Sequence, residues 1–487
     1  MESTRELKIG GTERGREVRG NAAGKSGEEA SAITEGSISR SIWRLALPTW
    51  GAFVFLNLMS IVDMFFVGKL GPVAVASVAM GGIMIGVVIM LALGVEAGTT
   101  ALVANAMGRN ERERAGIVTG QGMLIALFLA AVLAGVGIPL APAIIRTLGG
   151  EPEVVTAGAS YLRVVSGGGV AILVTITLAA ALRGAGDAIT PCKAMIFANL
   201  VNAVLDPIFI FGMFGFPRLG VAGSAWATVI GRAVGMLLLL GMFVSSLKSA
   251  VPLRLRYLRP RWDTIGSICR IGIFASGRVM LRNIALVVLL RLTAMFGTAA
   301  VAAYGIGFRL QLLVLGPGKG FGTAAATMVG QNIGVRKPDR AERAGWIAAG
   351  TAMAVGLCIT GGFWLAPQFI IRVFNTDAEV VAAGASLLRW WSASFPFLIV
   401  AFVLSLAMNG AGDSLRPMII TGIALVAVGI PLAYGLAKSW GEVQGIWVAL
   451  FCAHVLAGLL SVVVFKRGAW RAVGLRQTES SVQAGLR

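Results

Sequence analysis

The sequence predicts an all-α polytopic membrane protein with 12 transmembrane helices in two parallel six-helix repeats. Three observations support this fold class. The 487-residue chain is 56% hydrophobic and 13% charged, with a mean hydropathy of +0.82, whereas soluble domains contain about 25% charged residues. Apolar segments of about 20 residues alternate with short polar loops along the whole chain. The second half of the sequence also repeats the first half at one constant offset, which takes Gly184 to Gly410.

The repeat is visible in loops as well as in apolar runs. Ala-Gly-Ala-Ser at 157–160 recurs at 383–386, and Gly-Ala-Gly-Asp at 184–187 recurs at 410–413. One charged loop is three residues longer in the second copy, so that Gly116 matches Gly345 there. The chain is therefore a tandem duplication, which has to be recognised before single elements are assigned.

Each repeat supplies six candidate spans. Those of the first repeat lie at 45–67, 76–105, 116–142, 155–182, 188–212 and 220–247. Those of the second lie at 267–296, 300–333, 344–371, 380–408, 415–437 and 444–466. At about 1.5 Å per residue, each is long enough to cross a hydrocarbon core about 30 Å thick. Because six is even, both repeats begin on the same side, and an axis along the membrane normal relates them.

Lysine and arginine predict the orientation. Most of the 42 basic residues fall at the N-terminus, at the C-terminus and in the loops after even-numbered spans. The loops of the opposite side contain only Lys69, Arg146, Arg218, Arg372 and Lys438. Basic residues collect in cytoplasmic loops, so we expect a multi-pass protein of the cell (plasma) membrane with both termini in the cytoplasm. This asymmetry explains the net charge of +19 without a nucleic-acid partner.

The domain organisation follows from these spans. We expect a disordered cytoplasmic tail at 1–40, an N-lobe at 41–247, a basic cytoplasmic linker at 248–266, a C-lobe at 267–467 and a cytoplasmic tail at 468–487. Residues 1–40 are rich in Gly, Ser, Glu and Arg and contain no apolar run. The four cysteines have no metal or redox spacing, and His454, on the last span, is predicted to be a satisfied helix contact.

Positions where the two repeats disagree indicate the functional residues. Some polar residues of the first repeat align with an apolar residue or a glycine of the second. They are Asp63 (aligned with Leu289), Glu96 (Gly322), Asn202 (Val428) and Asp206 (Leu432). An aspartate at a helix centre costs about 2.5–3.5 kcal/mol on insertion scales and marks an ion, proton or substrate site by default. By contrast, Asp187 of the first repeat aligns with Asp413 of the second, and both are predicted to begin helices.

The fifth span carries a polar stripe. Asn199, Asn202 and Asp206 follow the spacing i, i+3, i+7 and therefore share one helical face. Asn57 and Asp63 lie on the first span. Burial and a neighbouring carboxylate both favour the protonated form of an acid, so this set is predicted to bind and release a proton. Na⁺ at Asp63, Asn202 and Asp206 is the alternative, and helix-to-helix hydrogen bonding without transport is a second one.

The C-lobe instead carries intramembrane bases. They are Arg278, Arg282, Arg291, Arg309, Lys319 and Arg389. Arg278 and Arg282 share a face at i, i+4, which allows them to bind an anionic or zwitterionic substrate such as a carboxylated metabolite or a lipid phosphate. Alternatively, these arginines pair with Asp63, Asp206 or Glu96, or extend to the headgroups.

Several motifs resemble the multidrug and toxic compound extrusion (MATE) family. They are Val62-Asp63 through Phe66-Val67-Gly68, Leu182-Arg183-Gly184 with Gly186-Asp187, Asn202 to Asp206-Pro207, and Val329-Gly330-Gln331-Asn332. The resemblance covers residues 41–467. It implies a V-shaped pair of lobes that alternates between outward-open and inward-open states and exports amphipathic drugs and metabolites in exchange for H⁺ or Na⁺.

The resemblance also implies residue roles. Asp63, Asn202 and Asp206 match the first-lobe coupling positions of the family, and Gln311 lies on the eighth span, where substrate contacts are made. We add Arg278, Arg282, Arg309, Trp390 and Trp391 as candidates that line the substrate cavity. The chain departs from the family pattern because the seventh and tenth spans carry no acid, and because the fourth span offers only Thr175 and Thr177 where relatives have an asparagine.

These observations predict a secondary active efflux transporter that works as a monomer by cation antiport and alternating access, with an amphipathic small molecule and the lipid bilayer as partners. The absence of acids in the second lobe favours H⁺ as the coupling ion, and we expect no cofactor and no catalytic residue. A lipid-linked precursor flippase of the same superfamily and an exporter of anionic metabolites remain the alternatives. A major-facilitator transporter is disfavoured because its Asp-Arg-x-Gly-Arg-Arg loop is missing after the second span.

Overall fold

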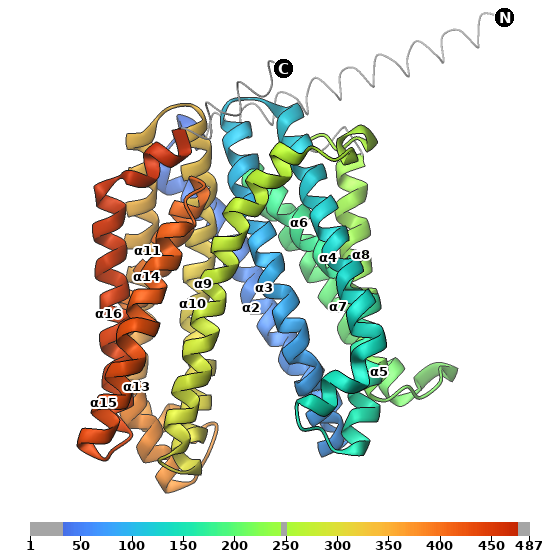
Figure 1. Ribbon diagram of the computed structural model, residues 1–487, viewed down its shortest axis with the longest axis vertical. Coiled ribbons are helices and arrows are strands. Elements are labelled where there is room, and N and C mark those ends of the chain that lie inside the picture. Colours follow the sequence, from blue (N-terminus) through green and yellow to red (C-terminus); the bar gives the residue numbers. More distant parts are fainter. Residues whose placement is uncertain (1–32, 245–250, 476–487) are drawn as a thin grey trace, which may run out of the picture. The chain divides into compact units, whose positions relative to one another are not determined.

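The computed structural model describes residues 33–244 and 251–475, and every regular element in these ranges is helical. Eleven helices are long and apolar enough to cross a membrane, and the number is up to 12 if one bent pair counts as a single span. The all-α polytopic fold class is therefore confirmed (Figure 1). Most of the predicted N-terminal tail, and the C-terminal tail after residue 475, lie outside the described residues.

The chain divides into two compact units. Among the described residues, unit 1 contains 33–37 and those between Phe55 and Ile268, and unit 2 contains Ile38–Val54 and 269–475. The helix α2 (Ile38–Gly68) therefore belongs to unit 2 in its first half and to unit 1 in its second half. The lobes expected from sequence order, 41–247 and 267–467, do not include this exchange.

The helices of unit 1 surround an apolar core formed mainly by α3, α4, α6 and α8. Besides the end of α2, the elements are α3 (Pro72–Gly108), α4 (Arg112–Thr147), α5 (Pro152–Gly167), α6 (Gly169–Ala185), α7 (Ile189–Phe211), η1 (Met213–Gly215), α8 (Val221–Val244) and η2 (Leu255–Leu258). The first residues of α9 (Trp262–Ala294) also belong to unit 1.

Unit 2 contains the remaining helices and the first half of α2. They are the rest of α9, α10 (Thr298–Gly334), α11 (Pro338–Leu365), α12 (Pro367–Arg372), α13 (Ala378–Gly410), α14 (Leu415–Thr421), η3 (Gly422–Gly429), α15 (Ile430–Trp440) and α16 (Gln444–Arg467). Trp43 of α2 packs edge-on against Phe321 of α10, with ring centroids 5.0 Å apart. A Cβ on Gly320 would lie 2.8 Å from the Ala46 carbonyl oxygen, so only a glycine admits α2 at this distance.

The helix boundaries repeat at the offset that relates the sequences. Both ends of α10 are the counterparts of the two ends of α3, and α11, α13 and α14 begin at this same offset after α4, α5 and α7. The loop before α7 shows the same agreement. Asp187 accepts hydrogen bonds from the backbone N–H groups of Ile189 and Thr190, and Asp413 accepts one from the N–H of Arg416. The predicted role of both aspartates at helix starts is confirmed.

The fourth span differs between the units. In unit 1 it is the bent pair α5 and α6, which meet at 46°. Gly167, Gly168 and Gly169 occupy the bend, whereas α13 continues as one helix through Ala393, Ser394 and Phe395. Consecutive glycines weaken a helix by about 1 kcal/mol each relative to alanine. A Cβ on Gly168 would also lie 2.3 Å from the Val229 side chain, so the bend allows close contact with α8.

The described part of the predicted linker is docked on α4 of unit 1. The Gln121 side chain donates hydrogen bonds to the backbone carbonyls of Tyr257 (2.6 Å) and Arg259 (2.9 Å), and it accepts one from the N–H of Arg261 (2.8 Å). A Cβ on Gly116 would lie 2.1 Å from a linker carbonyl oxygen. The linker is therefore a fitted part of unit 1 as far as it is described.

Unit 2 holds its own trailing segment in a similar way. Residues 469–475 are helical, and Arg471 forms ion pairs with Asp339 (3.2 Å) and Glu342 of α11. Trp470 is fully buried and stacks on Phe465 at a centroid distance of 4.9 Å. The segment after the last helix of each unit is thus tied to the helix that follows its second span.

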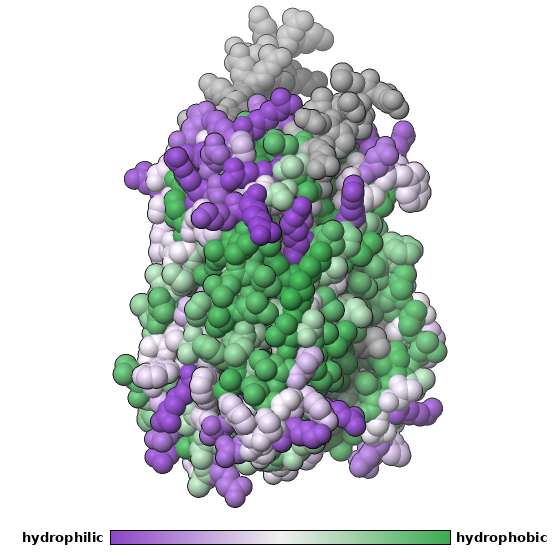
Figure 2. All heavy atoms as spheres, turned by 60° about the vertical axis from the view of Figure 1, so that its left-hand side comes forward, coloured by the Kyte–Doolittle hydropathy of each residue, from purple (hydrophilic) through white to green (hydrophobic). Residues whose placement is uncertain are grey.

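The surface has the character of a membrane protein. Figure 2 shows a broad hydrophobic band on one face, bounded at both ends by hydrophilic residues. Exposed large apolar side chains include Leu357 and Trp364 of α11 and Leu459 and Val463 of α16. Such a continuous apolar surface is stable against lipid rather than water, so the protein is a multi-pass membrane protein.

Candidate functional site

Asp63 and Asp206 come together in unit 1. Asp63 is half-buried on α2, Asp206 is 0% exposed on α7, and their carboxyl groups lie close enough to interact. Two carboxylates that lie close together in a buried place repel each other when both are ionised, which favours the protonation of one of them. Within the described residues, no group donates to the buried Asp206 Oδ2. A proton on this oxygen would satisfy it by donating to Asp63.

Further polar groups surround the acid pair. The Ser224 hydroxyl of α8 donates to Asp63 Oδ1 at 2.9 Å. The Asn202 side chain approaches Asp206 Oδ1 at 3.4 Å and Thr228 Oγ1 at 3.5 Å, which are long contacts for hydrogen bonds. The helices α2, α7 and α8 thus bring carboxylate, hydroxyl and amide groups to one buried place. We call these five residues the acid cluster.

Sequence reasoning missed Ser224, Thr228 and a neighbouring tyrosine. Tyr161 of α5 is 7% exposed and lies close enough to interact with the charges of Asp63 and Asp206. The comparison of repeats contained a signal for two of these residues, because the counterparts of Tyr161 and Ser224 are Leu387 and Leu450. Thr228 gave no such signal, since its counterpart is His454.

The other two predicted coupling residues lie on the same helices. Asn199 is buried on α7, and its side chain donates to the Met195 carbonyl of its own helix at 2.7 Å. Asn57 is half-buried on α2, six residues before Asp63. Their assignment to ion coupling stays a prediction.

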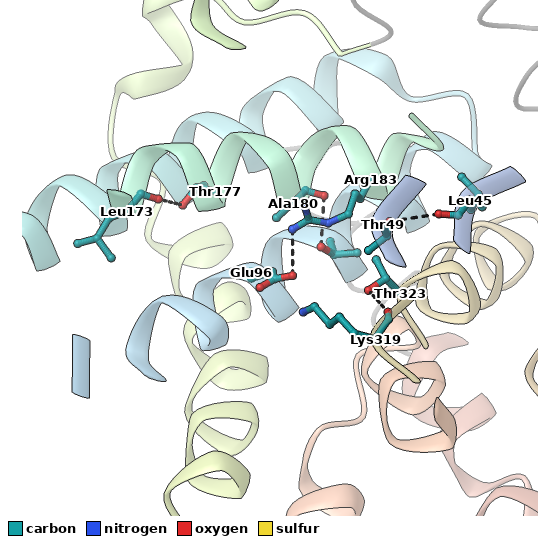
Figure 3. A network of polar contacts seen from close by, with 10 residues as sticks. Leu45, Thr49, Glu96, Leu173, Thr177, Ala180, Arg183, Lys319 and Thr323 are labelled. Atoms are coloured by element: carbon teal, nitrogen blue, oxygen red, sulfur yellow. Dashed lines mark hydrogen bonds and ion pairs between the residues drawn. The ribbon is translucent and has the colours of Figure 1, made fainter. Parts of the chain in front are cut away.

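Glu96, the third acid found only in the first repeat, is part of a buried ion pair in unit 1. Arg183 of α6 donates to Glu96 Oε1 of α3 at 2.9 Å, and both side chains are about nine-tenths buried. One turn away, the Thr100 hydroxyl donates to the Ala180 carbonyl at 3.2 Å. Figure 3 shows this ion pair between the two helices. Glu96 therefore joins α3 to α6.

One predicted substrate residue of unit 2, Trp391, lies in an aromatic stack. Tyr304 of α10 stacks on Trp391 of α13 (5.6 Å between centroids) and on Trp447 of α16 (6.1 Å). Trp391 also stacks on His454 at 6.4 Å. The His454 Nδ1 lies 2.8 Å from the Ser394 hydroxyl, so the prediction of a satisfied helix contact is confirmed.

Three further substrate candidates lie on α10 and α13. Gln311 of α10 is buried, whereas Arg309 of the same helix is exposed. Trp390 is 39% exposed and packs edge-on against Phe451. Their role in substrate contact stays a prediction.

Arg278 and Arg282 occupy successive turns of α9 in unit 2. The Arg278 guanidinium lies over the Phe402 ring of α13, 5.5 Å from its centroid. The Arg278 Nε is buried and has no acceptor among the described residues. Arg282 is exposed at the surface. Neither arginine forms an ion pair within residues 33–244 and 251–475.

The chemistry of the acid cluster suits a light cation. In the described ranges, no three His, Cys, Asp or Glu residues are grouped as ligands for a metal ion. Carboxylate, hydroxyl and amide oxygens can bind Na⁺, and a pair of contacting carboxyls can hold a proton. Both ions remain compatible with the side chains of this cluster.

Comparison with known proteins agrees with this architecture. The family model MatE matches the chain twice, at residues 48–208 and 275–435. The starts of the two matches agree with the internal repeat to within one residue. The model thus recognises each half of the chain separately.

Individual relatives cover almost the full chain. The probable multidrug resistance protein NorM of Thermotoga maritima is 28% identical over 90% of this chain and 95% of its own length. An FAD transporter of Shewanella oneidensis is 23% identical over 88% of this chain and 95% of its own. A solved outward-facing multidrug resistance MATE transporter superimposes with a TM-score of 0.84 at 25% identity, covering 92% of this chain and 99% of that one. The chain is therefore a member of the MatE family of multidrug efflux transporters, and it is a transporter rather than an enzyme.

Proposed function

We propose that this transporter exports amphipathic organic compounds in exchange for protons that bind at Asp63 and Asp206. The transport is secondary active and proceeds by alternating access. Each unit of pH difference corresponds to about 1.36 kcal/mol per proton, so one proton per substrate supports roughly a tenfold uphill gradient.

The observation that carries this proposal is that the carboxyl groups of Asp63 and Asp206 lie together in unit 1, close enough to interact. With one proton between them, the carboxyl groups attract each other. Without it, two negative charges repel at contact distance in a poorly hydrated place. Proton binding and release therefore change the force between α2 and α7. A helix pair whose attraction depends on a proton can link the proton to a conformational change.

A proton explains the cluster better than Na⁺. A bound Na⁺ needs oxygen ligands, but the Asn202 side chain points its Nδ2 donor at Asp206 Oδ1 and Thr228 Oγ1, at 3.4 and 3.5 Å, and an N–H group does not bind a cation. The donor-free Asp206 Oδ2 is satisfied if it carries the proton itself. The second unit offers no equivalent site, because Leu289 and Leu432 replace the two aspartates. We therefore assign a single coupling site, in unit 1.

Proteoliposomes with purified protein test this proposal. An acidic interior and a sodium-loaded interior are set up separately, and the uptake of a fluorescent organic compound is followed for wild type, Asp63→Asn and Asp206→Asn. Asp263→Asn is the matched control, since Asp263 is an exposed carboxylate in the first turn of α9. We expect uptake driven by the pH gradient that both cluster variants abolish and the control retains. Sodium-driven uptake at neutral pH would contradict proton coupling.

The relatives leave the charge of the substrate open. One is a probable multidrug resistance protein and another is an FAD transporter, and FAD carries negatively charged phosphates. For this chain, organic cations and amphipathic anions are therefore both candidate substrates. The uptake experiment uses one dye of each charge for this reason.

A further inference from the structure

We propose that Arg278 and Arg282, together with Phe402, form a binding site in unit 2 for the negatively charged group of an amphipathic substrate. The ligand is a carboxylate or a phosphate joined to an apolar or aromatic body. This inference rests on the proposed transport function only in that it names the substrate class of the transporter. The binding of an anion at this place can be measured without transport.

The depth of Arg278 argues against a simple membrane-surface role. α9 runs from Trp262 to Ala294, so Arg278 is its central residue, about 24 Å from either end at about 1.5 Å per residue. Half of the hydrocarbon core is about 15 Å thick. The side chain of an arginine at the middle of a span is too short to reach the headgroups of a flat bilayer. An ionisable residue at this depth is a functional candidate by default.

Arg278, whose Nε is buried, and Arg282 also lack an acidic partner within the described residues. Unlike Arg183, which Glu96 neutralises at 2.9 Å, Arg278 and Arg282 form no ion pair in the described chain. Arg278 contacts the face of Phe402, and its Nε has no acceptor among the described residues. A buried charge without a counter-charge is strongly unfavourable, whereas one that meets a carboxylate or phosphate is not. The site around Arg278 and Arg282 can therefore accept an anionic ligand as counter-charge.

The spacing of the two bases fits one ligand. Side chains at i and i+4 lie on the same helix face, about 5–6 Å apart at their Cβ atoms. Two like charges at this spacing destabilise a helix, and an anion between them removes the repulsion. Guanidinium groups are planar and bind carboxylate or phosphate oxygens with two parallel hydrogen bonds. Arg282 is exposed, so a ligand can reach the pair from outside unit 2.

The internal repeat shows that the fold itself does not need these bases. The counterparts of Arg278 and Arg282 in the first repeat are Ala52 and Leu56, and that of Phe402 is Ile176. The apolar residues fill the same helix positions in a copy with matching helix boundaries. The second repeat therefore differs from the first at both sites. It has no acids at the positions of the coupling site, and it carries bases where the first repeat has Ala52 and Leu56.

The neighbours of the arginines indicate an apolar body on the ligand. Phe402 presents its ring beside the Arg278 guanidinium. Met418 of α14 also lies against this turn of α9, because its sulfur would be 2.7 Å from a Cβ on Gly277. Methionine is flexible and polarisable and adapts to apolar groups of different shape. The charged head and apolar wall together select amphipathic anions rather than small inorganic ones.

Two dyes with one ring system test the inference. Carboxyfluorescein and rhodamine methyl ester share the xanthene rings, but the first is an anion and the second a cation. Gradient-driven uptake into proteoliposomes is measured for both, after filtration and extraction at one fixed pH. The variants are Arg278→Gln, Arg282→Gln and Arg278→Lys. Arg291→Gln is the matched control, since Arg291 is an exposed base of the same helix.

We expect Arg278→Gln to lower carboxyfluorescein uptake at least tenfold, because a charge-assisted hydrogen bond is lost, and to leave rhodamine uptake unchanged. Arg278→Lys should recover part of the anion uptake, and Arg291→Gln should behave as wild type. Equal loss of both dyes, or unchanged anion uptake in Arg278→Gln, would overturn the inference. Unchanged rhodamine uptake shows that the variant is folded.

A binding measurement separates this inference from the proposed function. Fluorescence anisotropy of carboxyfluorescein is titrated with the purified protein in detergent, without any gradient. Binding that depends on Arg278, in a protein that moves neither dye, would support the site and reject proton-driven export. Rhodamine uptake that depends on Asp63, without carboxyfluorescein binding and without lipid movement that depends on Arg278, would support export and reject the site. If neither is seen, both are rejected.

The anion could also come from a lipid. The same vesicles are prepared with fluorescently tagged phosphatidylglycerol, and its movement between leaflets is followed by chemical quenching from outside. Lipid movement that depends on Arg278, with no binding of the soluble dye, would assign the site to a lipid phosphate and still support anion recognition. Movement that is identical in wild type and Arg278→Gln, together with no dye binding, would overturn the inference.

Discussion

Glu113 and Glu342 occupy matching positions in the two halves of the chain, and each forms an ion pair with an arginine from the segment that trails its own unit. The partner of Glu113 is Arg256, at 2.5 Å, and the partner of Glu342 is Arg471. The two arginines are not at matching positions, so the same contact is made from different trailing sequences. Glu113 lies in the first turn of α4, and Glu342 is the fifth residue of α11.

The linker contact can be tested with a glycine. Gly116→Ala places a Cβ 2.1 Å from the Pro252 carbonyl oxygen, so the linker has to move away from α4. We expect the variant to unfold at lower temperature and to be cut faster by trypsin at the linker arginines. Gly350→Ala is the control, because its Cβ would meet nothing within 4 Å. Alanine there should stabilise α11 by up to about 1 kcal/mol. Similar melting of both variants would contradict the fitted linker.

The acid pair should respond as one unit. If Asp63 and Asp206 share one proton, either single Asp→Asn substitution already removes proton coupling. The double variant should then lose no more pH-driven uptake than either single variant, because contacting residues are not additive. Uptake at one fixed gradient is compared for the four proteins. A double variant that is far less active than both singles would show two independent proton sites.

Ser224 should shift the pH dependence of transport without being required for transport. Ser224→Ala removes the 2.9 Å hydrogen bond to Asp63, and a hydrogen bond to a charged group contributes about 1.5–3 kcal/mol. The ionised form of Asp63 loses this stabilisation, so half-maximal proton-driven transport should move to higher pH. Thr228→Val removes only the 3.5 Å contact with Asn202 and should move it less. The pH dependence of initial uptake rates measures both shifts, and equal shifts would argue against the assigned geometry.

The Glu96–Arg183 ion pair should stabilise the folded protein without taking part in proton coupling. Glu96→Gln leaves the buried Arg183 charge without its carboxylate partner, which typically costs about 3–5 kcal/mol. We expect a marked loss of thermal stability in detergent, measured by the temperature at which the protein aggregates. Any protein that folds should keep its dependence on the pH gradient. Asp377→Asn, which changes an exposed cap of α13, should have a much smaller effect.

Much of the fold could be predicted because the sequence contains two copies of the same helix pattern. The matching residues predicted matching helices, and the boundaries of α3 and α10 agree at the same offset. The unduplicated aspartates, Asp63 and Asp206, were predicted as a pair and lie in contact. Both inferences use patterns that can be seen in the sequence without knowledge of tertiary packing.

What the sequence could not supply depends on how helices approach each other. Tyr161 reaches the acid pair because Gly81 of α3 leaves room for its ring, at 2.7 Å from where a Cβ would be. Nothing in the helical period of α5 indicates that α3 is close at this one residue. The pairing of Glu96 with Arg183 was missed for the same reason, since it joins helices whose rotation is set by packing.

The sharing of α2 between the units has a consequence for biosynthesis. Trp43 and Phe321 are in contact, although all of unit 1 from Phe55 to Ile268 separates them along the chain. A ribosome that has finished α2 must still translate that whole stretch before the partner of Trp43 exists. The first half of α2 therefore waits in the membrane with its packing face uncovered, while the second half can already join α7 and α8. Helix contacts in unit 1 can form during translation, but α2 is completed only when α10 arrives. Substitutions at Trp43 should accordingly impair the yield of assembled protein more than the insertion of its early helices.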